Sequence, residues 1–145
     1  MTAADRKSVM RKIGRSQDGQ AMVEFALVLP VLLLLIFGII QFGILFNNYV
    51  TLTDAVRAGA RQAAVSRTVP DPVAATESRL KKSAAGLDAD DLVITVTPYD
   101  PTDGTATWAQ GGDVTVKATY PYDIDLFGVV VMSGRFESET TERVE

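Results

Sequence analysis

A long uncharged segment near the N-terminus constrains this chain more than any other feature of its sequence. No Asp, Glu, Lys or Arg occurs from Phe25 to Thr53, and the first part of this stretch is apolar throughout apart from Pro30 and Gly38. A helix needs about 20 largely apolar residues to cross a bilayer. The segment therefore predicts a transmembrane helix, which we place at residues 20–46.

The charges on the two sides of this segment differ. Residues 1–19 carry five basic residues against two acids, a net charge of +3, whereas the rest of the chain carries −7. Basic flanks favour the cytoplasmic side of a membrane. We therefore expect a cytoplasmic basic leader at 1–19 and an extracytoplasmic chain after about Asn47. The acidic remainder also argues against a nucleic-acid partner, which would require a basic surface.

A cleaved secretory signal is the first alternative for a basic region followed by an apolar one. Its apolar core usually has about 7–15 residues and ends at a small-x-small cleavage site. Here the longer run is followed directly by Phe46, Asn47, Asn48 and Tyr49. The pattern favours a signal anchor, and thus a single-pass protein of the cytoplasmic membrane.

The side chains that usually carry chemistry are scarce. The chain has no cysteine and no histidine, which excludes disulfides, thiolate metal sites and the commonest general base. Acids at residues 88–91 and at Asp100 and Asp103 offer oxygen ligands for calcium, but their spacing differs from an EF-hand loop, and solvated turns are the preferred interpretation. We predict no catalytic residue, no cofactor and no metal site.

Glu24 stands just inside the apolar segment, where a carboxylate is costly. Insertion scales assign about 2.5–3.5 kcal/mol to an acid at mid-membrane and less near the end, so Glu24 needs a partner or a purpose. One interpretation is that it reaches the headgroups or interacts with the helix N-terminus. Cleavage after Gly19 would alternatively give Gln20 a free amine one helical turn away, in the same chain or an adjoining subunit. Glu24 and the adjacent Phe25 are thus the candidates for charge pairing and subunit register.

The residues around Glu24 also carry a family resemblance. The sequence GQAMVEF at residues 19–25 resembles the processing site of type IV pilin-like precursors, and GQAMVEFALVLP at 19–30 resembles the TadE-like pseudopilins in particular. The similarity continues to about residue 65. It implies that a prepilin peptidase of the tight-adherence system cuts between Gly19 and Gln20.

The resemblance also implies a function. It suggests a TadE-like pseudopilin or minor pilin subunit that acts in assembly of Flp-type pili for surface adherence or associated secretion. Its partners would be the peptidase, other pilin or pseudopilin subunits, the assembly machinery and membrane lipid. Two alternatives stay open: a permanently anchored accessory factor of a pilus or secretion system, and an anchored enzyme or ligand-binding module, which would need a pocket with convergent polar groups.

Helical spacing continues beyond the membrane segment. Apolar and small residues recur every three or four positions, which predicts a helix from Ala21 to about Arg67, with a kink at Pro30 and an extracytoplasmic stalk at 47–69. The small residues from Ala55 to Ala64 allow close packing, chiefly on the chain's own domain. A local ion pair is expected among Asp54, Arg57 and Arg61.

Residues 70–145 are predicted to form a small extracytoplasmic head. We expect a second helix at 73–85, capped by Gly86, and strands at 92–97, 113–120 and 135–141. Trp108 is expected on a short strand before the second of these, and the aliphatic residues 129–132 are expected in the core, or more rarely on a subunit or membrane surface. The predicted fold class is α+β: a long N-terminal transmembrane helix that continues into a stalk and packs on a small antiparallel sheet.

Overall fold

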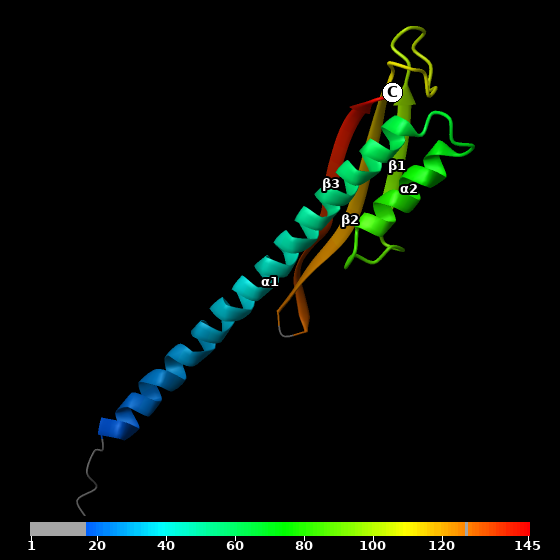
Figure 1. Cartoon of the computed structure of the whole chain (residues 1–145). Helices are drawn as coiled ribbons and strands as arrows, with labels where there is room; N and C mark the ends of the chain where they lie inside the picture. The colour runs from blue at the N-terminus through cyan, green and yellow to red at the C-terminus, as the bar shows by residue number, and fades with distance from the viewer. Residues whose placement is uncertain (1–16, 127) are drawn as a thin grey trace, which may run out of the picture. The chain divides into compact units, whose positions relative to one another are not determined.

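The computed structural model describes residues 17–126 and 128–145. Its elements are, in order, helices α1 (Gln17–Val65) and α2 (Pro72–Ser83) and strands β1 (Val93–Tyr99), β2 (Asp113–Leu126) and β3 (Val129–Arg143) (Figure 1). The chain divides into two compact units, residues 1–37 and 38–145, and α1 contributes to both. The predicted α+β class, with a long apolar helix followed by an antiparallel sheet, is confirmed.

The described part of the first unit is the N-terminal half of α1. No residue from 19 to 37 is buried, and apolar side chains such as Leu27 and Leu34 expose 73% and 56% of their surface. Pro30 lies inside the helix. Because proline has no N–H, the helical bond to the carbonyl of Ala26 is missing there. The described part of this unit presents an apolar surface and contains no buried residue.

The second unit contains the rest of α1, α2 and a three-stranded antiparallel sheet in the order β1-β2-β3 (Figure 1). Burial alternates along the first residues of β2, as the apolar and polar alternation there predicts. The core joins all these parts through fully buried side chains: Leu52, Val56 and Ala60 from α1, Leu80 from α2, and Val114, Val116 and Ala118 from β2.

Small residues let α2 approach α1 closely. Gly59 of α1 is buried, and a Cβ atom added to it would lie 3.1 Å from the Cβ atom of Leu80 in α2. Helix α2 begins as its sequence predicts: Asp71 accepts a hydrogen bond from the Ala74 backbone N–H at 2.9 Å, and Pro72 occupies the first helical position. The expectation that the small residues pack on the chain's own domain is confirmed.

The last turn of α1 is tied to distant parts of the chain. Trp108 donates its indole N–H to the carbonyl of Ala63 at 2.9 Å, and the backbone N–H of Glu145 donates to the carbonyl of Ala64 at 3.0 Å. Carbonyls at a helix C-terminus lack intrahelical partners, so these contacts satisfy them. The expectation of a strand at Trp108 is wrong: this residue lies in the loop between β1 and β2, where its ring can reach α1.

Two further expectations are corrected by the structure. Helix α2 ends at Ser83 and is capped by Ala84 rather than Gly86, which adopts a left-handed conformation with φ 99° in the turn that follows. The aliphatic residues Val129–Met132 are exposed rather than in the core. The reason is that β2 and β3 are longer than predicted and continue past the end of β1, whose pairing with β2 stops at Thr119.

Candidate processing and assembly site

The predicted cleavage point lies at the start of α1. The helix begins at Gln17, so Gly19 and Gln20 are both in its first turn, and both are exposed. Glycine is a poor helix former. The bond between Gly19 and Gln20 therefore lies at an exposed position of the helix, next to a residue that does little to stabilise it.

Glu24 has a hydrogen-bond partner that we did not predict from the sequence. The side-chain amide of Gln20 donates a hydrogen bond to a carboxylate oxygen of Glu24 at 3.0 Å. The signal for it was the spacing of four residues, which places the two side chains on one face of a helix. The two ion pairs among the described residues involve other acids, so this neutral amide leaves the negative charge of Glu24 uncompensated.

The surroundings of Glu24 on the helix are apolar. Phe25 beside it exposes 60% of its surface, and positions three and four residues on are Leu27 and Val28, which are also exposed. Among the residues that the structure describes, α1 is the one helix long and apolar enough to cross a membrane. From Ala21 to Ile40 of α1, Glu24 is the one carboxylate and the other residues are apolar.

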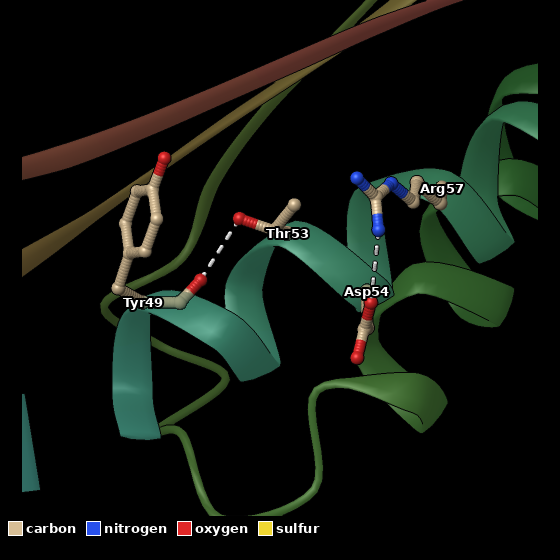
Figure 2. Close-up of polar contacts among 4 residues, drawn as sticks. All are labelled: Tyr49, Thr53, Asp54 and Arg57. Carbon is tan, nitrogen blue, oxygen red and sulfur yellow. Dashed lines mark hydrogen bonds and ion pairs between the residues drawn. The ribbon is translucent and has the colours of Figure 1, made fainter. Parts of the chain in front are cut away.

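A second polar feature lies on the part of α1 that belongs to the second unit. Arg57 and Asp54 form the expected ion pair, with 3.4 Å between guanidinium nitrogen and carboxylate oxygen, and Thr53 donates to the carbonyl of Tyr49 (Figure 2). Both charged side chains are more than half exposed. Arg61 lies outside this pair and instead lines a shallow hollow with Arg79. Exposed pairs of this kind contribute little to stability.

An open cavity of about 240 Å³ lies between α1 and the sheet. Its lining combines the amides of Gln41 and Asn48 with the carboxylates of Asp91 and Asp123 and the ring of Tyr122. In the described part of the chain, no three acidic side chains converge as metal ligands would. The cavity therefore offers hydrogen-bonding groups without an arrangement that points to a particular reaction.

The other acids proposed as calcium ligands stabilise their own loops. Asp88 accepts from the backbone N–H of Asp90, and Asp100 accepts from that of Thr102. Asp103 accepts from both the hydroxyl and the N–H of Thr105, and the hydroxyl bond is the main reason that the pKa of Asp103 lies below its usual value. These contacts are turn-forming hydrogen bonds, as the interpretation of solvated turns requires.

Across the sheet, one ion pair joins neighbouring strands. Lys117 on β2 and Glu137 on β3 approach to 2.7 Å, and this hydrogen bond raises the pKa of the lysine. Both side chains are substantially exposed, so the pair lies on a water-facing surface of the sheet. The folded unit thus has a hydrated face in addition to the face that packs on α1.

Comparison with known proteins identifies the N-terminal segment. Residues 19–61 match the family model of TadE-like proteins, so the predicted resemblance is confirmed over this segment. The match includes Gly19, Gln20, Glu24, Phe25 and Pro30, and it ends before α2 and the sheet. No curated protein and no solved structure matched the chain. The match associates the chain with the Tad/Flp pilus system in general and, with the apolar helix, indicates a single-pass membrane protein.

Proposed function

We propose that this chain, with its TadE-like N-terminal segment, is a pseudopilin or minor pilin subunit that acts in assembly of Flp-type pili for surface adherence. The observation that carries the proposal is the position of Glu24. It is a lone carboxylate on the exposed apolar surface of α1, five residues after Gly19 in a segment that matches the TadE-like model. The role proposed is structural rather than enzymatic.

Cleavage would change the electrostatics of this helix end. A prepilin peptidase adds water across the peptide bond between Gly19 and Gln20, which leaves a carboxylate on Gly19 and an ammonium group on Gln20. The new cation stands one helical turn from Glu24, to which the uncleaved chain donates the neutral side-chain amide of Gln20. An ion pair between these groups neutralises charge that would otherwise be costly in apolar surroundings.

Assembly would use the same two groups between subunits. When apolar helices pack in parallel, the amine of one subunit can reach Glu24 of its neighbour only at a particular axial offset. Pairing of the charges therefore selects one register, and the exposed apolar side chains around Phe25 supply the contact area. In the stored state, we place residues 1–19 inside the cell, 20–46 in the membrane, and the stalk and head outside.

The first experiment determines the N-terminus of the membrane-isolated protein by mass spectrometry, with and without the cognate prepilin peptidase. We expect Gln20 as the first residue only when the peptidase is active. The Gly19→Val variant, with a branched side chain at the cleavage point, serves as the matched control and should keep its leader. An intact leader on the unmodified chain in the presence of active peptidase would refute the proposal.

A second arm separates a filament subunit from a permanently anchored accessory factor. Filaments are sheared from cells that express the unmodified chain, Glu24→Gln or Glu139→Gln, the last being an exposed acid on β3. A filament subunit appears in the sheared fraction, and only Glu24→Gln should reduce its amount while cleavage and membrane content stay normal. Retention of the unmodified chain entirely in membranes would favour the accessory factor.

A further inference from the structure

The β2–β3 hairpin carries an apolar end that the fold leaves uncovered. Its tip is formed by the last residues of β2, the turn with Gly128 at φ 82°, and the first residues of β3. From Val129 to Met132 each side chain exposes between 55% and 63% of its surface. Beyond Thr119, β2 pairs with β3 alone, so the third strand does not cover this part of the hairpin.

Strand β3 presents apolar side chains to both faces of the tip. Successive side chains of a strand point to opposite faces, so four consecutive aliphatic residues place apolar groups on each side of β3, even with the irregularity opposite Ile124 and Asp125. Strands that face water on one side usually alternate apolar with polar residues. A protein partner on one face would leave the other face of the tip in water, whereas lipid surrounds both.

The tip also lies at a defined height along α1. Gln41 of α1 donates its side-chain amide to the backbone carbonyl of Asp125 at 2.8 Å, so the end of the hairpin lies beside Gln41. A span of about 20 residues ends at Ile40 when counted from Ala21 and at Ile44 when counted from Phe25. The end of the hairpin is therefore level with the outer boundary of the membrane-spanning segment.

The apolar surface of α1 at this height continues that of the hairpin. Ile39, Ile40, Phe42, Ile44 and Phe46 all expose more than half of their surface. Charged residues return on the hairpin only at Asp123 and Arg135, farther from the tip, apart from Asp125. The side chain of Asp125 is engaged within the turn, where it accepts from the N–H of Gly128 at 2.7 Å.

We propose that the tip of the β2–β3 hairpin inserts shallowly into the outer leaflet of the membrane that α1 spans. Asp123 and Arg135 then lie at headgroup level, and the residues from Val129 to Met132 lie among the first carbons of the acyl chains. Zwitterionic phospholipid is the favoured occupant, because the rim carries one charge of each sign, Asp123 and Arg135, and so no net attraction for anionic lipid. A second contact restricts rotation and tilt of the folded unit at the membrane surface. This inference depends on the membrane span but not on cleavage or on entry into a filament.

Because the chain has no cysteine, single labelled positions can test the proposal in the full-length protein. The protein is reconstituted in vesicles of phosphatidylcholine and phosphatidylethanolamine with a nitroxide at Val130→Cys, Leu35→Cys or Val93→Cys. These side chains have similar exposed fractions of 55%, 55% and 51%. Val93 pairs with Thr119, which is about 20 Å along β2 from Asp125 at 3.3 Å per residue, so it is the matched aqueous control.

The measurement is the ratio of collision rates with molecular oxygen, which concentrates in lipid, and with a water-soluble nickel chelate. We expect a high ratio at Leu35 and Val130 and a low ratio at Val93. A low ratio at both Val130 and Val93, with a high ratio at Leu35, would overturn the hairpin contact and leave the span intact. A low ratio at Leu35 would overturn the span itself and the inference with it.

Coverage by a second copy of the chain gives a different result. Val130→Cys would then be shielded from both reagents, and spin–spin broadening would grow as the protein-to-lipid ratio increases. That outcome would also overturn the proposal, because the tip would be occupied by protein instead of lipid. A far-UV circular dichroism spectrum equal to that of the unmodified chain confirms that each labelled variant is folded.

Discussion

The two units share helix α1 but differ in whether its apolar side chains are buried. Between residues 19 and 37 of α1 no side chain is buried, whereas Leu52, Val56 and Ala60 are fully buried in the core of the second unit. The local sequence explains this difference. Apolar residues surround the first part of the helix on all sides, but in the second part a buried stripe alternates with charged positions such as Asp54 and Arg57. A helix that is apolar all round fits lipid or like helices, and a narrow stripe fits a folded domain.

The largest expected effect comes from replacing one leucine by alanine in each unit. We expect Leu80→Ala to lower the free energy of unfolding of the second unit by about 2–5 kcal/mol, because it leaves a cavity among fully buried side chains. Leu34→Ala, at an exposed position of the first unit, should change it by less than about 0.5 kcal/mol. Urea unfolding in detergent micelles, followed by the fluorescence of Trp108, measures both. Equal losses would mean that the two units form one cooperative structure.

Much of this contrast could be predicted from the sequence. The absence of charge from Phe25 to Thr53 was sufficient to predict the apolar helix, and strict alternation was sufficient for the buried part of β2. The strands were predicted too short because Pro121, which has no N–H for a strand ladder, indicates the end of a strand, although Tyr122, Ile124 and Leu126 continue the alternation. An aliphatic run such as 129–132 has the same composition in a core as at a lipid surface, and only the pairing of the strands shows that nothing covers it.

For a related reason, the sequence predicted the residues of the candidate site but not the contact made by Trp108. The spacing from Gly19 to Glu24 is a local pattern, and the TadE-like match covers both residues. The position of Trp108 depends on its hydrogen bond to the carbonyl of Ala63, which is 45 residues away, and no local sequence pattern predicts such a contact. Local signals thus predicted the apolar helix and the starts of α2, β1 and β2, while long-range contacts decided the loop and the hairpin tip.

A smaller effect is expected from adding one methyl group at two glycines of α1. In Gly59→Ala the new Cβ atom would lie 3.1 Å from that of the fully buried Leu80, whereas nothing lies within 4 Å of the corresponding position at Gly43. Overpacking costs about 1–3 kcal/mol and the better helix propensity of alanine offsets about 1. We expect a net loss of about 1 kcal/mol for Gly59→Ala in the same unfolding experiment.

Gly43→Ala serves as the matched control, because it changes helix propensity without a new contact. Its free energy of unfolding should stay unchanged or rise by up to about 1 kcal/mol. If both variants were equally stable, α2 would have to move away from α1 at no cost, and the contact between Gly59 and Leu80 would not be close packing.

The smallest expected effect concerns the water-exposed loop between β1 and β2. Thr105→Val removes the hydroxyl that donates to Asp103 at 2.6 Å, the main cause of the lowered pKa of that acid. The pKa should therefore rise toward the ordinary value of 3.8, yet stay below it because the backbone N–H of Thr105 still donates. A group whose pKa is lowered by folding stabilises the fold above its unfolded pKa, and this contribution disappears as the pH falls through the folded pKa. The variant should lose part of the stabilisation present above pH 3.8 and show a weaker dependence of stability on acidification.

Carboxyl NMR titration measures the pKa of Asp103 in each variant. Thr107→Val is the control, since its hydroxyl contacts that of Thr105 and not Asp103. An unchanged pKa in Thr105→Val would show that the loop is too mobile in water to hold this hydrogen bond, and that order in the second unit is confined to its buried core.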